Sequence, residues 1–379
     1  MKFPLSYIVA MASILLVGNV KGLEKGDDCP DFSLKGSDGH TYALSEIKGK
    51  APFVIAWYPK AFTGGCTREC KSFRSDGEAM REYDALYFTA SVDSVEDNTR
   101  FSQSLNLDYP ILSDPGKKVA EAFGVVTDFR SVPYRWTFYV GKDGKILKVD
   151  KKIKVVSAGS DVAKTFEELG IKKRSTLDNS IASAERAAGW ELLFNGKDDS
   201  GWMTNKKTKI QTKIDDGSLV PFKSGGYVIV HEKKFKNFEF VSDVKMSAER
   251  CNSGIFFRVS DLSNPVQSGF EAQILGRSGN GYHDFGAIYD LSKTSMGDFK
   301  YDDWNRVLIR AVGSNIEVHI NGNKVSSIDT DKFSERGRRP DGTKHKFGVI
   351  KDLPWEGYLG FQDHGAMVWY KNVKAREIK

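Results

Sequence analysis

The spacing of apolar residues divides the chain into two parts. In the first part, apolar runs of strand length alternate with charged stretches in which apolar residues recur at helical spacing. The predicted strands are residues 52–58, 85–93 and a hairpin over 137–149, and the predicted helices are residues 67–86, 95–105 and 158–169. Strands that alternate with helices indicate an α/β domain with a central sheet.

The second part, from Gly189 onward, has a different pattern. Short segments of alternating apolar and polar residues follow one another, separated by Gly, Asn and Asp. The segments are YVIVHE, FEFVSDVKM, SGIFFRVS, FEAQIL, NRVLIRAV and IEVHING. This pattern is typical of an all-β domain, and its many turns favour a double-sheet sandwich or jelly roll over a small barrel.

The stretch between the two parts is polar and rich in small residues. We therefore expect one domain over residues 23–172 and another over residues 189–379, joined by a linker over residues 173–188. A short helix is predicted within the linker, because residues 182–188 are rich in alanine.

Composition agrees with two domains, because 379 residues with 40% hydrophobic content can build more than one core. The net charge of +6 is a small excess of 56 basic over 50 acidic residues, which argues against a nucleic-acid-binding surface. Residues 1–22 combine an early Lys2 with an apolar run over 5–17, as a signal peptide does. We therefore expect an exported protein, periplasmic or secreted. An uncleaved anchor is the alternative, although the run is shorter than the ~20 residues that a spanning helix needs.

The four cysteines are too few for a disulfide framework in a chain of this length. Cys29 and Cys251 are isolated and are expected to be small buried residues. Cys66 and Cys70, by contrast, share one short segment, PKAFTGGCTREC. This segment joins a predicted strand to a predicted helix, so Cys66 lies at a helix N-terminus, where free N–H groups and the helix dipole stabilise a thiolate. Cys66 is therefore a candidate nucleophile, and the hydroxyl of Thr63 can orient the thiolate or a peroxide oxygen.

The segment around Cys66 contains a Pro-x-x-x-Thr-x-x-Cys signature, formed by Pro59, Thr63 and Cys66. Four further stretches accompany it: PDFSLKGSDG, SVDSVEDN, YPILSDP and RWTFYVGKDGKI. With these residues the chain resembles, over residues 24–172, the AhpC/TSA peroxiredoxins, in particular the bacterioferritin comigratory protein group. The resemblance implies a thioredoxin-like fold, a hydroperoxide substrate, a thioredoxin-like or other thiol electron donor, and no cofactor.

The resemblance also implies a mechanism. The Cys66 thiolate attacks the peroxide and becomes a sulfenic acid, while Arg135, which matches the family arginine by position, favours the thiolate and holds the peroxide. A second thiol must then resolve the sulfenic acid, and Cys70 is the candidate. Family members with a resolving cysteine on this helix usually place it five residues on, and the spacing here is four. Disulfide formation would require the first helical turn to unwind, so an external thiol and a structural Cys70 are alternatives.

Two other functions use paired cysteines. A thioredoxin-like oxidoreductase needs Cys-x-x-Cys, and the spacing here is Cys-x-x-x-Cys. The observed spacing is similar to that of copper chaperones of the cytochrome oxidase assembly type, which add a distant histidine to the two cysteines. The first domain has no histidine after His40, which disfavours copper delivery.

The second part of the chain resembles the 3-keto-disaccharide hydrolase family, which has a concanavalin A-like jelly-roll sandwich fold. The resemblance runs from Trp190 nearly to the C-terminus. It rests on WELLFNGKDDSGW, NSGIFFR, GFEAQI, DWNRVLI, the Asn321-Gly322 turn and GYLGFQDHGAMVWYKNVKAREI. It implies that this domain acts on an oligosaccharide or keto-glycoside.

Two predicted strands carry candidate residues for such a site. Glu271 and Gln273 are two residues apart and so point to the same face, and the same argument applies to Gln362 and His364. If these strands line a concave surface, they set a carboxylate, two amides and an imidazole around one groove.

A base in this groove could remove the acidified proton beside a 3-keto group, so that the glycosidic bond breaks by elimination and hydration. Glu271 and His364 are the candidate bases, and Arg258 and Tyr289 are expected as substrate-binding neighbours. A carbohydrate-binding module without catalysis is the alternative. His283-Asp284 fits no metal-binding loop motif, so no metal ligand is assigned and a metal requirement stays open.

Overall fold

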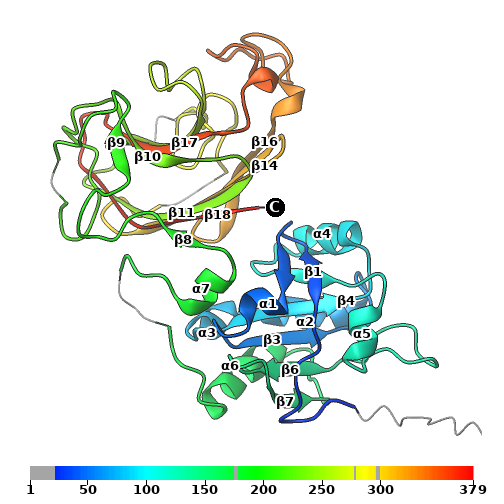
Figure 1. Cartoon of the computed structure of the whole chain (residues 1–379). Coiled ribbons are helices and arrows are strands. Elements are labelled where there is room, and N and C mark those ends of the chain that lie inside the picture. Colours follow the sequence, from blue (N-terminus) through cyan, green and yellow to red (C-terminus); the bar gives the residue numbers. More distant parts are fainter. Residues whose placement is uncertain (1–21, 175–177, 213, 277–278, 296–298, 379) are drawn as a thin grey trace, which may run out of the picture.

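The chain forms two domains that pack against each other, an α/β domain from its first half and a β domain from its second half (Figure 1). The computed structural model describes residues 22–174, 178–212, 214–276, 279–295 and 299–378. The predicted signal peptide, residues 1–22, lies outside the described residues except for Gly22. Within the described ranges, no helix is long and apolar enough to cross a membrane.

A seven-stranded sheet forms the centre of the first domain. Its strands are β1 (Ser33–Gly36), β2 (Thr41–Ala43), β3 (Phe53–Trp57), β4 (Leu86–Ser91), β5 (Ile111–Ser113), β6 (Thr137–Val140) and β7 (Ile146–Asp150). Their order is β2-β1-β5-β4-β3-β6-β7. Strands β3, β4 and β5 run parallel to one another, and the predicted hairpin over 137–149 is confirmed as the antiparallel pair β6 and β7.

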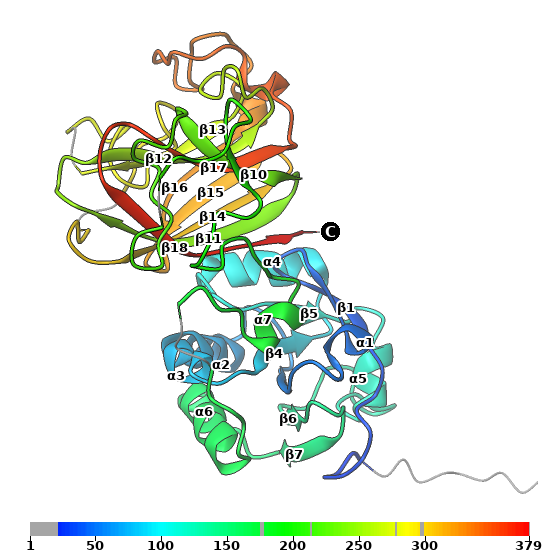
Figure 2. The same ribbon diagram turned by 60° about the vertical axis from the view of Figure 1, so that its left-hand side comes forward.

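Helices cover both faces of this sheet (Figure 2). They are α1 (Leu44–Ile47), α2 (Gly64–Ser75), α3 (Gly77–Arg81), α4 (Val95–Ser104), α5 (Lys118–Ala122) and α6 (Ala158–Glu168). Because β3 lies between the two layers, all five of its residues are buried. The single helix predicted over 67–86 is wrong, since α2 ends before Asp76 and α3 begins after it. The carboxylate of Asp76 accepts a hydrogen bond from the backbone N–H of Ser160 on α6, at 3.0 Å.

Two antiparallel sheets form the second domain, which confirms the predicted sandwich. The strands are β8 (Glu191–Leu192), β9 (Trp202–Thr204), β10 (Val228–Phe235), β11 (Phe238–Met246), β12 (Asn252–Val259), β13 (Phe270–Leu275), β14 (Asn305–Val312), β15 (Asn315–Ile320), β16 (Asn323–Asp329), β17 (Gly357–Gln362) and β18 (Val368–Glu377), with short 3₁₀ helices η1 (Thr330–Lys332) and η2 (Ile350–Asp352). One sheet has the order β13-β12-β17-β10-β9 and the other β16-β15-β14-β11-β18-β8. The apolar core lies between the sheets.

A short helix in the linker, α7 (Ser183–Ala187), contacts both domains. Its first two backbone N–H groups donate hydrogen bonds to the carboxylate of Asp84 in the first domain, at 3.1 and 2.8 Å. Glu185 on the same helix forms an ion pair with Lys374 of β18, at 2.8 Å. The helix predicted within residues 182–188 is therefore confirmed, and it is held from both sides.

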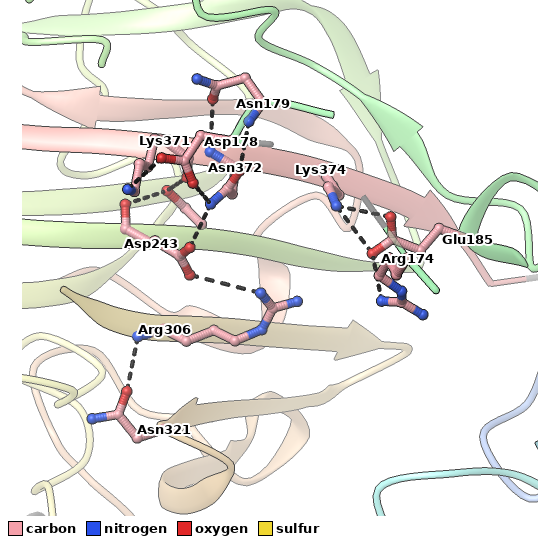
Figure 3. A network of polar contacts seen from close by, with 11 residues as sticks. Arg174, Asp178, Asn179, Glu185, Asp243, Arg306, Asn321, Lys371, Asn372 and Lys374 are labelled. Carbon is pink, nitrogen blue, oxygen red and sulfur yellow. Dashed lines mark hydrogen bonds and ion pairs between the residues drawn. The ribbon is translucent and has the colours of Figure 1, made fainter. Parts of the chain in front are cut away.

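The linker residues before α7 attach to an irregularity in β18 (Figure 3). The pairing of β18 with β11 shifts by one residue at Asn372, which frees its backbone groups. The backbone N–H of Asn179 donates to the side-chain oxygen of Asn372 at 2.7 Å. In return, the backbone N–H of Asn372 donates to the side-chain oxygen of Asn179 at 2.9 Å. Asp178 adds an ion pair to Lys371, at 2.6 Å.

A buried ion network joins the domains directly. Arg376 at the end of β18 donates to Asp38 at 2.9 Å and Tyr42 at 3.0 Å in the first domain, and to Glu239 of β11 at 2.7 Å. Arg310 of β14 contacts the other oxygen of Glu239 at 2.5 Å and the backbone carbonyl of Asp38. Burial alone would raise the pKa of Glu239, but Arg376 and Arg310 lower it, so the carboxylate is charged.

Candidate active sites

Cys66 lies in the first turn of α2, after the loop that leaves β3. Phe62 in that loop has a positive φ of 61°, and Thr63 is extended at φ −95° and ψ 150°, so the chain turns sharply before Gly64. The helix begins three residues before the predicted start near Thr67. Cys66 is 1% exposed, and it lies where backbone N–H groups have no partner within the helix.

Arg135 precedes β6 and reaches the cysteine from across the site. Its Nη2 donates a hydrogen bond to Sγ of Cys66 at 3.3 Å, and its Nη1 pairs with Glu69, one turn further along α2. A Cβ on Gly65 would lie 3.3 Å from Nη2, so the glycine leaves room for the guanidinium. The positive charge is thus held beside the sulfur that would attack a peroxide.

Glu69 is an ionisable group at the centre of this site. It is fully buried, and burial raises its pKa to about 7, although Arg135 acts in the opposite direction. Its Oε1 atom has no hydrogen-bond partner in the described part of the chain. Protonation of Glu69 therefore changes the charge next to Arg135 and Cys66 near neutral pH.

Cys70 lies one turn after Cys66 on the same helix and is fully buried. Both thiols are free. Burial raises the pKa of Cys70, and the Glu69 carboxylate raises it further. Tyr109 donates a hydrogen bond from its hydroxyl to the backbone carbonyl of Cys70 at 3.0 Å, which holds this turn of the helix. In the observed helix Cys70 is therefore a protonated, enclosed thiol, and α2 must unwind before it can act on Cys66.

The remaining residues of the signature lie in the loop before α2. Thr63 is exposed and donates from its hydroxyl to the carbonyl of Lys60 at 2.9 Å, so its hydroxyl does not contact the thiol in this structure. Pro59 is half-buried at the start of the loop. Of the predicted residues, Arg135 contacts the cysteine directly and Pro59 and Thr63 shape the loop that carries it.

In the second domain, Glu271 lies across the outer face of the five-stranded sheet. Its neighbours Phe270 and Ala272 belong to the core between the sheets, so Glu271 points away from it. On β12, a Cβ at Gly254 would fall 2.1 Å from Oε1 of Glu271, so the missing side chain makes the space for the carboxyl group. Glu271 is 7% exposed, and burial raises its pKa to about 8, opposed by the charge of Lys346.

Two amide side chains flank that carboxyl group. Gln273 lies opposite Gly254 on one side, and Gln362 on β17 lies on the other side of Gly254 by the register of β12 and β17. Gln273 donates through Nε2 to Asn252 at 2.9 Å, and Gln362 donates through Nε2 to the Tyr227 hydroxyl at 2.6 Å. The carbonyl oxygens of both amides are buried and have no partner among the described residues. The face therefore presents two hydrogen-bond acceptors beside an acid.

Tyr289 closes one side of this face. Its backbone N–H donates to the carbonyl of Glu271 at 2.9 Å, which ties the loop after β13 to the strand. Its ring stacks on His283 with centroids 4.6 Å apart, and Nζ of Lys346 lies 4.2 Å from the ring centre. The structure therefore brings together four of the predicted residues: Glu271, Gln273, Gln362 and Tyr289.

Comparisons with known proteins found relatives of both domains. Residues 25–149 match the AhpC/TSA family, and peroxiredoxin Bcp of Bacillus subtilis is 35% identical over 157 residues, which are 40% of this chain and 99% of that protein. The chain belongs to the AhpC/TSA peroxiredoxins. The peroxiredoxin domain is also similar to the solved peroxidoxin BcpB of Mycobacterium tuberculosis, at 30% identity over 40% of this chain and 99% of that one, with a TM-score of 0.36.

The second domain matches a different family. Residues 189–376 match the 3-keto-alpha-glucoside-1,2-lyase-like domain. A solved candidate glycosyl hydrolase of Parabacteroides distasonis is 28% identical to this chain, and the match covers 54% of this chain and all of that one, with a TM-score of 0.45. The protein thus joins a peroxiredoxin domain to a 3-keto-glucoside lyase-like domain.

The structure corrects two predicted residues of the lyase-like domain. Arg258 is fully buried and donates to the backbone carbonyls of Lys236 and Gly313, at 2.9 to 3.1 Å, so it ties two turns together and does not reach the candidate site. His364 is exposed and lies in a bend after β17, since the strand ends at Gln362. The turn forms because Gly365 adopts a φ of 81°.

Several residues of both sites were not predicted. Glu69 is one helical turn from Cys66 in the peroxiredoxin domain, and that spacing is the signal that would have found it. Tyr227, Asn252 and Lys346 come from segments far apart in the sequence, and no local pattern marks them. Cys29 and Cys251, predicted as small buried residues, are confirmed as buried at 6% and 8% exposure.

Proposed function

We propose that the peroxiredoxin domain reduces hydroperoxides at Cys66. The thiolate attacks one peroxide oxygen, an S–O bond forms, the O–O bond breaks, and the departing alkoxide takes a proton and leaves as alcohol or water. Arg135 supports this step, because its guanidinium lies 3.3 Å from the sulfur and can bind the anionic oxygens that develop there. This contact between Arg135 and Cys66 carries the proposal.

Resolution of the sulfenic acid is assigned to Cys70. Its thiol would displace the hydroxyl from the Cys66 sulfur, which forms a disulfide and releases water, and an external dithiol of the thioredoxin type would reduce that disulfide. The spacing of four residues and the burial of Cys70 mean that the first turns of α2 open first. An external thiol acting directly on Cys66 is the alternative.

Peroxide consumption by the full-length protein with a dithiol reductant tests this part. Cys66→Ser should abolish it, and the matched control Cys251→Ser, in the other domain, should retain it. Peroxide consumption that survives Cys66→Ser would contradict the assignment of Cys66 as the nucleophile. Cys70→Ser separates the two routes of resolution: if Cys70 resolves, this variant accumulates a sulfenic acid that dimedone traps, and thioredoxin no longer supports turnover.

We further propose that the second domain cleaves 3-keto-glycosides, with Glu271 as the base. The carboxylate takes the proton from C2 beside the C3 ketone and leaves an enolate. The electron pair of the enolate then forms a C1–C2 double bond, and the oxygen at C1 takes a proton and leaves as the free sugar. Water can then add to the product. The pKa of Glu271, raised by burial to about 8, supports a carboxylate strong enough to accept a carbon-bound proton. A sugar has to displace covering side chains to reach it, because Glu271 is only 7% exposed.

Release of free monosaccharide from a 3-keto-α-glucoside disaccharide tests this second activity. Full-length protein carrying Cys66→Ser is the reference, so that peroxidase chemistry does not interfere. Glu271→Gln should abolish release and leave the fold intact. Binding without release in the reference protein would make the domain a carbohydrate-binding module.

We also propose export to the periplasm or the exterior, from the signal-like residues 1–22. Fractionation of cells that express the full-length chain, with mass spectrometry of its N-terminus, tests this. A cytoplasmic protein that keeps residues 1–22 would contradict it.

A further inference from the structure

Tyr227 lies at the edge of the candidate lyase site, directly before β10. Its backbone is fixed on both sides, since its N–H donates to Asn205 at 2.9 Å and its carbonyl accepts from the N–H of Asp363 at 2.9 Å. Its ring packs edge-on against Phe256 of the sheet face, with centroids 6.3 Å apart. The side chain is 38% exposed, so one part of it is fixed and another part meets the solvent.

The hydrogen bond from Gln362 determines what the Tyr227 hydroxyl can do. Because Nε2 of Gln362 donates to the tyrosine oxygen at 2.6 Å, the hydroxyl accepts there and keeps its own hydrogen for another partner. No described residue accepts that hydrogen. Gln362 lies on β17, and Gly254 lies on the neighbouring strand β12. The carboxyl group of Glu271 lies over Gly254. Because neighbouring strands are about 4.8 Å apart, the carboxyl group is close to the Tyr227 hydroxyl on this face. The hydroxyl and the carboxyl group therefore fit the two ends of one sugar ring.

Several other polar atoms on this face are acceptors. The carbonyl oxygens of Gln273 and Gln362 are buried without a partner, and an ionised Glu271 only accepts. Such groups suit sugar hydroxyls, which can donate. A ketone oxygen cannot donate, so it needs a donor from the protein. Two other donors lie nearby. The ammonium of Lys346 lies over the Tyr289 ring on an exposed side chain. The amide group of Asn252 lies beside Gln273, from which its oxygen accepts a hydrogen bond.

We propose that the Tyr227 hydroxyl donates the hydrogen bond that binds the C3 keto oxygen of the substrate, and that the hydrogen bond from Gln362 orients this hydroxyl. This inference rests on the proposed lyase function. When Glu271 removes the C2 proton, the electron pair moves into a C2–C3 double bond and the keto oxygen becomes an enolate oxygen. The pair then returns, forms the C1–C2 double bond and breaks the bond from C1 to the glycosidic oxygen, which takes a proton from the protonated Glu271 or from water as the free alcohol leaves. Tyr227 stabilises the enolate by its hydrogen bond and keeps its proton throughout.

The protonation states of the two residues agree with these roles. Burial raises the pKa of Tyr227, and the nearby Glu271 carboxylate raises it further. The phenol therefore stays protonated where Glu271, with a pKa of about 8, becomes ionised. A tyrosine donor and a glutamate base can thus be present together at mildly alkaline pH.

The test compares Tyr227→Phe with wild type in the full-length protein. Two substrates are used, a 3-keto-α-glucoside disaccharide and 4-nitrophenyl 3-keto-α-glucoside, whose leaving groups differ in basicity. We expect kcat to fall by about 10²-fold with KM changed by less than about threefold, as for loss of one donor to a developing oxyanion. The factor should be the same for both substrates. Tyr301→Phe, which alters another exposed tyrosine of this domain, is the matched control and should leave both constants unchanged.

Each other result would overturn the inference in a different way. Equal kcat in Tyr227→Phe and wild type would remove the tyrosine from the reaction and leave the proposed lyase function standing. A loss confined to the disaccharide would show that Tyr227 protonates the leaving oxygen and not the keto oxygen. A wild type inactive on both substrates, with a circular dichroism spectrum that shows the β domain to be folded, would overturn both proposals.

Discussion

Replacing Arg376 by methionine removes the positive charge at the centre of the domain interface and keeps much of the side-chain volume. Arg376 is 7% exposed and donates to Asp38 and Tyr42 on one side and to Glu239 on the other. Removing one partner of a buried ion pair destabilises a protein by about 3–5 kcal/mol, because a charge is left buried without compensation. Glu239 keeps Arg310, so we expect the lower end, about 3 kcal/mol.

Urea unfolding at neutral pH measures this loss, with tryptophan fluorescence and peroxidase activity as two probes. We expect the variant to unfold at lower urea and the two probes to separate, because the domains lose a shared contact. The control is Lys233→Met, which breaks ion pairs of a 38% exposed lysine with Glu191 and Glu377 and should change stability by less than about 1 kcal/mol. An Arg376→Met protein as stable as the control would refute the reasoning.

The same interface predicts a pH dependence. The pKa of Glu239 is lowered by Arg376 and Arg310, so its pairing contributes stability above the ordinary glutamate value of 4.5 and loses it as pH falls through the lowered value. The difference between wild type and Arg376→Met should therefore shrink in acid. A difference that stays constant as the pH is lowered would show that Arg376 acts through packing and not through charge.

Three further predictions concern the two sites. Gly254→Ala should lower keto-glycoside cleavage about 10²-fold, because the new Cβ displaces the Glu271 carboxyl group, and peroxide reduction should be unchanged; normal cleavage would contradict the geometry. The rate of keto-glycoside cleavage should rise with pH through about 8, as Glu271 loses its proton, and a rate flat between pH 6 and 9 would rule out that base. Glu69→Gln should slow peroxide reduction about tenfold and remove an inflection of the rate near pH 7, where Glu69 ionises; stopped-flow rates from pH 5 to 9 measure both effects.

Local patterns were sufficient for much of the fold. The alternation of apolar and polar residues along β13 placed Glu271 and Gln273 on one face, because side chains two apart in a strand point the same way. The loop that follows β3 placed Cys66 at a helix N-terminus, because the end of an apolar run and the start of a helical pattern are both local signals. These predictions depend only on neighbours in the chain.

Contacts between distant segments could not be predicted from such local patterns. The alternation that succeeded on β13 failed for His364, because the strand ends at Gln362 and a turn follows. Arg258 has the sequence context of a strand residue near the site, yet its side chain is buried against the carbonyls of Lys236 and Gly313.

The sequence by itself therefore determined the fold class of each domain, many of its elements and the position of Cys66 at a helix N-terminus. Tertiary structure alone decided that Arg135 and Glu69 meet at Cys66, that Gly254 makes room for Glu271, and that Gln362 donates a hydrogen bond to the Tyr227 hydroxyl. The reason is physical: the period of a strand or helix is set by bonds to adjacent residues, whereas these contacts depend on strand register and on packing between segments many residues apart.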